Sequence, residues 1–167
     1  MNWYGLLIGA VAIERFAELV VSQRNLSWSR ARGGVEFGAR HYPPMVVLHA
    51  SLLVGCLLEA AHRPFLPALG WPMLAVVLAA QGLRWWCIAT LGHQWNVRVV
   101  VIPDATRVTA GPYRFFSHPN YVAVVVEGIA LPLVHTAWVT AVVFTVLNAF
   151  LLRTRIGVEN AALAQLR

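Results

Sequence analysis

Long uninterrupted apolar runs constrain this chain more than any other feature of its sequence. They fall at about residues 3–21, 44–60, 69–91 and 119–152. Crossing the roughly 30 Å hydrocarbon core of a bilayer takes about 20 residues of α-helix. The first three runs therefore each predict one membrane-spanning helix, and the second run is only just long enough.

The run at 119–152 is too long for a single spanning helix. Its middle reads Leu-Pro-Leu-Val-His-Thr at 131–136, where proline and polar residues interrupt the apolar character. Proline ends or kinks a helix, so the block predicts two helices joined by a tight turn. Because backbone groups in hydrocarbon must be satisfied within each segment, the runs are expected to be helical. The predicted fold class is all-α: a polytopic membrane protein of about five transmembrane helices, the last two forming a helical hairpin, in a single membrane domain over 1–167.

The composition excludes an ordinary soluble domain. Hydrophobic residues make up 59% of the chain and charged residues 12%, whereas soluble domains have about 45–50% and about 25%. No basic residue precedes the first run and no small-residue cleavage site follows it, so we expect a retained first span rather than a cleaved signal peptide. Cys56 and Cys87 lie inside apolar runs without metal-ligand spacing. We infer packing cysteines, with no disulfide and no metal site.

Arginine supplies all thirteen basic residues, and its distribution predicts the orientation. Cytoplasmic loops of membrane proteins carry an excess of positive charge. Only Arg63 lies in the loops on one side of the predicted spans. The arginines that follow the first, third and fifth spans are Arg24, Arg30, Arg32, Arg40, Arg98, Arg107, Arg114, Arg153, Arg155 and Arg167. We therefore expect the N-terminus outside and residues 22–43, 92–118 and 153–167 in the cytoplasm. The net charge of +6 forms no basic stripe interleaved with exposed aromatics, so it does not indicate nucleic-acid binding.

A few charged residues interrupt the predicted spans. Glu14, Arg15 and Glu18 lie in the first and Arg84 lies in the third. Charge inside a membrane is costly and usually faces a partner or a cavity. We therefore predict that Glu14 or Glu18 pairs with Arg84. Glu127, in the fourth predicted helix, is predicted either to line the functional site or to satisfy a neighbouring group.

The polar segment between the third and fourth predicted helices indicates a binding site. A loop this long without strands or helices of its own is uncommon unless it binds something. It ends in Gly-Pro-Tyr-Arg-Phe-Phe-Ser-His-Pro-Asn-Tyr at 111–121. Pro119 suits the first turn of a helix, which places His118 and Asn120 at a helix entrance. The free N–H groups at such an entrance favour an anionic group.

Two further features of the sequence suit a ligand that carries a positive and a negative charge. Arg155 and Glu159 are four residues apart and share one face of a helix. Tyr113 and Tyr121 have aromatic faces that attract a cation by about 0.5–2 kcal/mol. Together these residues indicate a site for a zwitterionic or cationic molecule.

Over about residues 92–163, the chain resembles the isoprenylcysteine carboxyl methyltransferase family of membrane enzymes. Three elements agree with the family in order and spacing: the Gly-x-Tyr turn, the His-Pro-x-Tyr helix start, and the Arg-x-x-x-Glu after a hairpin. The resemblance implies methyl transfer from S-adenosylmethionine, bound on the cytoplasmic side, to a carboxylate of a lipidated substrate that enters from the bilayer. The apolar runs predict three N-terminal transmembrane helices over 1–91, and the resemblance implies a cofactor-binding catalytic region over 92–167, with the hairpin and a C-terminal tail. The residues that match the cofactor positions are Arg98, Thr106, Val108, Tyr113, His118, Pro119, Asn120, Tyr121 and Glu159. Arg155 falls where the family places its substrate-contacting arginine.

The nature of the methyl acceptor stays open at this point. A carboxylate with a pKa near 4 is already a nucleophile at neutral pH. A phenol or enol hydroxyl must lose its proton, for which His118, Glu159 or Glu127 is available. Arg155, Glu159 and His118 are the predicted catalytic residues, and Arg155 and Glu127 are the predicted substrate contacts. Asn160 stands where many family members carry a second glutamate, which favours a phenolic or polyketide-derived lipid as an alternative acceptor.

The alternative function is an NADPH-dependent membrane reductase of the sterol-reductase type, which has a segment similar to that around Asn120. Those enzymes usually follow the tyrosine with glycine and an acidic residue, whereas Val122 and Ala123 follow Tyr121 here. A catalytically silent membrane scaffold is a third class. The expected partners are a lipophilic small molecule or lipidated substrate and membrane lipids, with the oligomeric state open. We expect an integral protein of a bacterial inner membrane whose active site faces the cytoplasm.

Overall fold

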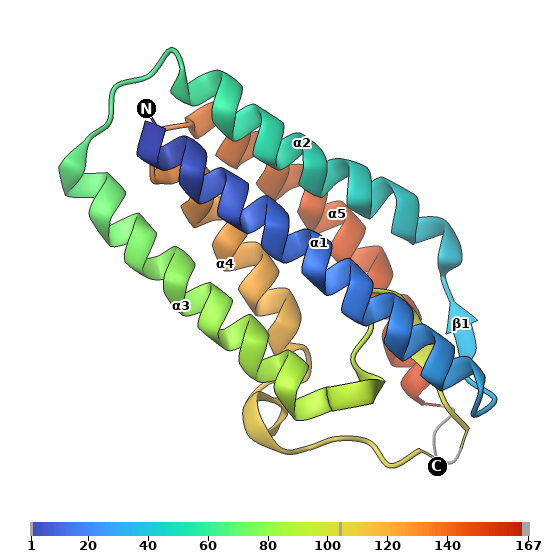
Figure 1. Cartoon of the computed structure of the whole chain (residues 1–167). Helices are drawn as coiled ribbons and strands as arrows, with labels where there is room; N and C mark the ends of the chain where they lie inside the picture. Colours follow the sequence, from blue (N-terminus) through green and yellow to red (C-terminus); the bar gives the residue numbers. More distant parts are fainter. Residues whose placement is uncertain (1, 104, 165–167) are drawn as a thin grey trace.

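In the described part of the chain, five α-helices run alternately up and down and form the body of the structure (Figure 1). A computed structural model of the chain describes residues 2–103 and 105–164. The helices are α1 (Asn2–Arg30), α2 (Tyr42–Ala60), α3 (Pro67–Leu91), α4 (Pro119–Leu133) and α5 (Trp138–Leu163). We call the end where α1, α3 and α5 finish and α2 and α4 begin the loop-rich end. The predicted C-terminal tail from 165, with Arg167, lies outside the described residues.

Among the described residues, three helical segments are long enough and apolar enough to cross a membrane. They are Ala39–Ala60, Pro67–Gln94 and Trp138–Leu163. The chain is therefore a helical membrane protein by length and composition. Helix α4 has 15 residues, about 22 Å of helix against a hydrocarbon core of roughly 30 Å. That α1 and α4 also cross the membrane stays a prediction, as does the orientation.

The turn in the last apolar block lies at residues 134–137, between α4 and α5. Thr136 has a φ of 56° there, which is unusual for a β-branched residue. Its hydroxyl donates a hydrogen bond to the Pro64 carbonyl oxygen at 2.7 Å, which holds the turn against the loop before α3. Gly128 lets α4 and α5 approach closely, because a Cβ at this position would collide with the Phe144 ring. The two helices pack directly against each other.

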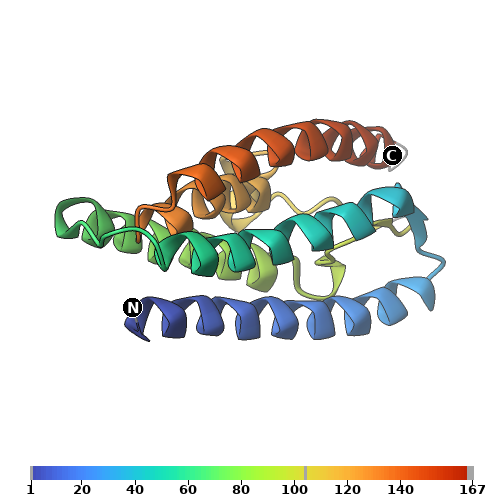
Figure 2. The ribbon, with the colours of Figure 1, turned by 90° about the horizontal axis from the view of Figure 1, so that it is seen from above.

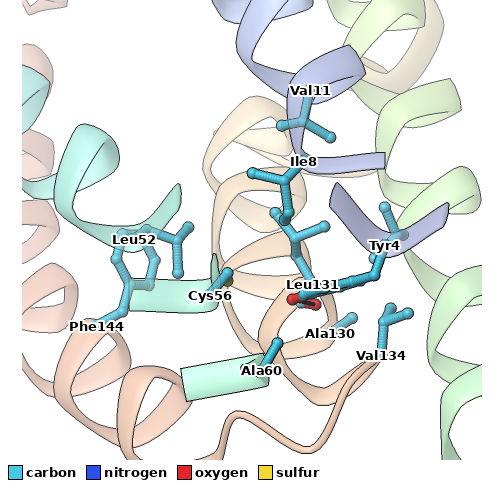
Figure 3. Packing of buried hydrophobic residues seen from close by; sticks show 11 residues of the cluster. Tyr4, Ile8, Val11, Leu52, Cys56, Ala60, Ala130, Leu131, Val134 and Phe144 are labelled. Carbon is cyan, nitrogen blue, oxygen red and sulfur yellow. Dashed lines mark hydrogen bonds between the residues drawn. The ribbon is translucent and has the colours of Figure 1, made fainter. Parts of the chain in front are cut away.

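The hydrophobic core fills the end opposite the loop-rich end (Figure 3). The buried residues of this core come from all five α-helices and from the turn after α4. They are Tyr4, Ile8, Val11, Leu52, Cys56, Ala60, Val77, Ala130, Leu131, Val134 and Phe144, and all but Val77 are labelled in Figure 3. The Tyr4 hydroxyl satisfies the Leu131 carbonyl at 2.9 Å. Apolar packing thus occupies one end of the bundle, and polar residues gather toward the other.

A small antiparallel sheet at the loop-rich end was not predicted from the sequence. Strand β1 (Val35–Phe37) pairs with β2 (Val99–Val101), and Val35 lies opposite Val101. Short 3-10 helices η1 (Ala39–His41), η2 (Gly92–Gln94) and η3 (Gly111–Arg114) flank the strands. The interpretation of 92–118 as a segment without strands or helices was therefore wrong. Three consecutive valines favour a strand, but their partner is distant in sequence.

Helix α1 continues to Arg30 rather than ending near Val21, where its apolar run stops. The extra turns carry buried polar residues that bind the segment after α3. The Ser22 hydroxyl donates to Asn96 Oδ1 at 2.7 Å, and the Asn25 amide donates to the Trp95 carbonyl oxygen at 2.7 Å. These contacts position the polar segment over the loop-rich end.

A buried ionic cluster links α1, α3 and α4. Arg84 donates to Glu18 at 2.7 Å, so the predicted pairing of these two residues is confirmed. Arg15 binds Glu18 at 2.8 Å and Glu127 at 3.0 Å, and Arg84 lies 3.5 Å from Glu127. Glu14 instead accepts hydrogen bonds from the side chains of Gln81 and Trp85. We use the name ionic cluster for Arg15, Glu18, Arg84 and Glu127.

Candidate functional site

A cavity of about 560 Å³ lies within the bundle toward the loop-rich end. Its volume falls in the range of roughly 300–1,000 Å³ that is typical of small-molecule sites. All five helices, the segment around β2, and η3 contribute to its wall. The sequence-predicted site residues that line it are Arg98, Val108, Tyr113, His118, Asn120, Tyr121, Arg155 and Glu159. Thr106, Pro119 and Glu127 are not among its lining residues.

Tyr121 connects Arg155 and Glu159, two charged residues of α5. Its hydroxyl accepts a hydrogen bond from Arg155 Nε at 2.7 Å and donates one to Glu159. Arg155 is only 6% exposed, and it also donates to the Val97 carbonyl oxygen and to Met45 Sδ. A guanidinium has five N–H groups, so these bonds with described residues leave two of them for a ligand. The shared helical face of Arg155 and Glu159 therefore faces the cavity with a fixed geometry.

His118 occupies the N-cap position of α4, but its side chain makes no capping hydrogen bond. The imidazole turns toward α5 instead. Its Nε2 lies 2.9 Å from Asn160 Oδ1, and its Nδ1 lies 3.7 Å from a Glu159 carboxylate oxygen. The ring stacks on Tyr121 with a centroid distance of 5.4 Å. His118, Tyr121 and Glu159 thus form one connected group at the entrance of α4.

We expect the His118–Glu159 contact to stabilise the protein at acidic pH and to lose this effect as the pH rises. Glu159 raises the pKa of His118 above its ordinary value of 6.5, against the opposing effects of burial and of the Arg107 charge. A raised pKa means that the stabilisation is complete below about pH 6.5 and is lost as the pH rises through the raised pKa. His118→Gln should therefore unfold at a lower temperature than wild type in mild acid, with the difference disappearing in alkali. Thermal unfolding in detergent would measure this, and a difference independent of pH would contradict it.

Arg98 and Tyr113 lie on the cavity wall outside the α4–α5 group. Arg98 donates to Glu36 on β1 at 2.7 Å, and its guanidinium lies 4.2 Å from the centre of the Tyr42 ring. Tyr113 belongs to η3, which begins at Gly111 with a φ of 56°. Burial raises the pKa of Tyr113, so its hydroxyl stays protonated. At this part of the cavity wall, Arg98 is therefore a cation paired with Glu36, and Tyr113 is a neutral phenol.

Three buried polar atoms on the cavity wall have no hydrogen-bond partner among the described residues. They are Asn120 Oδ1, Trp95 Nε1 and Asn148 Oδ1. Buried polar groups are nearly always paired, so three unpaired atoms that line one cavity indicate a ligand that pairs with them. Sequence reasoning missed Trp95, for which no local signal existed. It also missed Asn148, whose signal was a polar residue within an apolar run.

Glu127 is not among the residues that line the cavity, but it contacts two residues that do. Its carboxylate accepts hydrogen bonds from Arg15 and Arg84, which do line the cavity. Its predicted substrate contact stays a prediction. Of the three predicted base candidates, only His118 and Glu159 line the cavity.

The cavity wall formed by α1 and α2 is mostly apolar and reaches the outside of the bundle. Ala12, Phe16 and Ala50 line the cavity and are also exposed, with Phe16 69% exposed. Figure 2 shows α1 along one side of the bundle and α5 along the other, with α2 between them. Part of the apolar cavity wall therefore belongs to the outer surface of α1 and α2.

Comparison with known proteins gives matches over most of the chain. A sequence model of the Isoprenylcysteine carboxyl methyltransferase (ICMT) family matches residues 73–165. A relative from Bacillus subtilis (strain 168), described as "Uncharacterized protein YpbQ", is 35% identical over 166 residues, which cover 99% of this chain and 98% of the relative. An "Uncharacterized protein" of Haemophilus influenzae is 23% identical over 168 residues, covering 99% of this chain and 98% of the relative.

Proposed function

Because the chain belongs to the isoprenylcysteine carboxyl methyltransferase family, we propose that this membrane protein is an S-adenosylmethionine-dependent enzyme that methylates an oxygen of a lipophilic acceptor. The observation that carries the proposal is a single cavity that joins two kinds of wall. Tyr121, Arg155 and Glu159 contribute a charged, hydrogen-bonded group to its wall, and apolar residues of α1 and α2 that also lie on the outer surface contribute another part. Such a cavity suits a charged cofactor from water together with an apolar acceptor from the bilayer. The cytoplasmic location of the site belongs to the same proposal.

The residues at the entrance of α4 fit the cofactor. Bound S-adenosylmethionine supplies a methyl group on a positively charged sulfur, and as the acceptor oxygen forms the new O–C bond, the C–S bond breaks and its electron pair stays on sulfur. Asn120 Oδ1, which is buried and unpaired among described residues, would accept a hydrogen bond from a cofactor N–H. Glu159 would attract its ammonium group, and the Tyr113 ring would stabilise positive charge, whereas the Tyr121 ring already stacks on His118. In the first turn of α4, the N–H groups of Tyr121 and Val122 bind the His118 carbonyl oxygen. Among the described residues, the N–H of Asn120 is left in that turn to attract the cofactor carboxylate.

Arg155 would hold the acceptor oxygen. Its two N–H groups left free by described residues suit a carboxylate or a developing phenolate. A carboxylate acceptor is already ionised at neutral pH and needs no base. For a hydroxyl acceptor, the proton would pass to His118 or Glu159, the two base candidates that line the cavity. In either case the enzyme would act chiefly by aligning the reactants and excluding water, which is worth up to about 7–11 kcal/mol.

Calorimetry of the detergent-purified protein would test the cofactor. We expect S-adenosylmethionine to bind and NADPH not to bind. Asn120→Leu should weaken S-adenosylmethionine by about tenfold, because the variant removes the acceptor for a cofactor N–H. Binding of NADPH alone would instead favour the membrane reductase of the sterol-reductase type.

Activity is tested separately with a labelled methyl group. The purified protein, labelled S-adenosylmethionine and a total lipid extract are incubated together, and the labelled product is identified by mass. We expect label in a methyl ester or a methyl ether of a lipid. If the cofactor binds but neither lipid nor protein becomes labelled, a binding scaffold would replace the enzyme.

A further inference from the structure

Asn148 is a buried polar residue in the apolar half of α5. Its side chain is 2% exposed, and its Oδ1 has no hydrogen-bond partner in the described part of the chain. It lines the cavity, and the residues one turn away on either side, Phe144 and Leu152, are buried and apolar. An unpaired buried hydrogen-bonding group costs about 1–3 kcal/mol. The position is therefore unfavourable unless a ligand supplies the missing partner.

This part of the cavity lies deeper in the bundle than the residues assigned to methyl transfer. Asn148 precedes Arg155 by seven residues, or about 10 Å along the helix. His49 of α2 and Val124 of α4 also line the cavity, and the His49 ring lies edge-on to Phe144 with a centroid distance of 5.4 Å. We call the region bounded by Asn148, His49, Val124 and Leu152 the inner subsite.

The polar atoms of the inner subsite favour a hydrogen-bond donor. His49 Nδ1 lies 2.9 Å from the Met45 carbonyl oxygen. Because a carbonyl can only accept, Nδ1 carries a hydrogen, and in the neutral ring Nε2 is left as an acceptor. Asn148 Oδ1 is a second acceptor. A hydroxyl both donates and accepts, so it would satisfy the Asn148 amide in either of its two orientations.

The neighbouring charges disfavour a cationic donor. Arg15 and Arg84 of the ionic cluster line the same cavity, and their guanidinium groups would repel an ammonium group. The Glu18 carboxylate, which also lines the cavity, is already held by both arginines. A neutral hydroxyl therefore fits the inner subsite better than an amine.

We propose that Asn148 is a specificity-determining residue that binds a hydroxyl group of the lipophilic acceptor, at a point separate from the oxygen that receives the methyl group. The proposal rests on the proposed function, since it assigns the inner subsite to the acceptor rather than to the cofactor. It narrows the acceptor class to hydroxylated lipids. The exposed apolar residues of α1 and α2 that line the cavity suit the entry of such a molecule from the bilayer.

Lipid binding without cofactor tests the inner subsite directly. The probes are a saturated long-chain carboxylic acid with its mono-hydroxy counterparts along the chain, and a long-chain phenol with its counterpart that carries a second hydroxyl. Calorimetry in detergent should show that wild type binds at least one hydroxylated probe about tenfold more tightly than its parent, consistent with one buried hydrogen bond. Asn148→Leu should bind the two members of that pair equally. Equal binding of every pair by wild type, or a preference that survives in Asn148→Leu, would overturn the proposal.

Two further measurements separate this proposal from a structural role and from the proposed function. Leu147→Ala is the matched control, because Leu147 is adjacent on α5 but 50% exposed, and it should keep the preference. Asn148→Leu should unfold at the same or a higher temperature than wild type without lipid, since it removes an unpaired polar group. A lower unfolding temperature with the preference retained would make Asn148 structural.

A hydroxyl preference without methyl transfer to the preferred probe would leave the subsite standing and remove the methyltransferase. Methyl transfer with equal kcat/KM for both members of every probe pair would support the methyltransferase and overturn the inner subsite.

Discussion

Replacing Arg155 with alanine is expected to lower methyl transfer by about 10²–10³-fold, the usual effect of removing one positioned donor from a reacting oxygen. The guanidinium is buried and held on three sides, by Tyr121, Val97 and Met45, so its two remaining N–H groups are already oriented. Cofactor binding should change little, because Tyr121 still donates to Glu159 in the variant. Turnover with labelled S-adenosylmethionine would measure the first effect, and calorimetry the second.

Arg153 provides a matched control for this experiment. It is the same residue type on the same helix, but its side chain is exposed, so Arg153→Ala should keep wild-type turnover. Arg155→Lys should fall between the two, because an ammonium keeps the charge but cannot reproduce the planar fork of donors. Unchanged turnover in Arg155→Ala would remove this residue from the mechanism. A parallel loss of cofactor binding would instead assign Arg155 to the cofactor.

Replacing Arg84 with methionine is expected to lower the free energy of unfolding by about 3–5 kcal/mol, the usual cost of removing one partner from a buried ion pair. Arg84 is 7% exposed and binds Glu18 and Glu127. Without it, Arg15 is the one remaining arginine of the ionic cluster to balance both carboxylates. Unfolding in detergent, followed by circular dichroism, would measure the loss.

The control for Arg84 is an arginine with an exposed partner contact. Arg63 is 46% exposed in its side chain and lies 3.6 Å from Glu59, so Arg63→Met should cost less than about 1 kcal/mol. Adding Glu18→Gln to Arg84→Met should recover part of the stability, because it removes one of the uncompensated carboxylates. Equal losses for Arg84→Met and Arg63→Met would show that burial does not strengthen the cluster.

Glu127 illustrates how far sequence reasoning could go toward the site. Its place within an apolar run correctly indicated a charged group that needs a partner. Whether that partner was a substrate or an arginine could not be read from the run, because Arg15 and Arg84 lie on other helices. The short sheet could not be predicted for the same reason, because its two strands are far apart in the chain. Both α2 and α3 lie between β1 and β2.

The sequence by itself determined the helices, the polar end of the bundle, and the family-like motif at 111–121. These features are local: a helix satisfies its own backbone groups within one segment, so an apolar run is sufficient to predict it. The tertiary structure decided which side chains share the cavity. Trp95 and Asn148 belong to it only because α5 packs against α2 and α4, and the segment after α3 folds against α1. Whether a side chain faces a cavity, a neighbour or lipid depends on packing between distant segments, and no pattern within one helix records it.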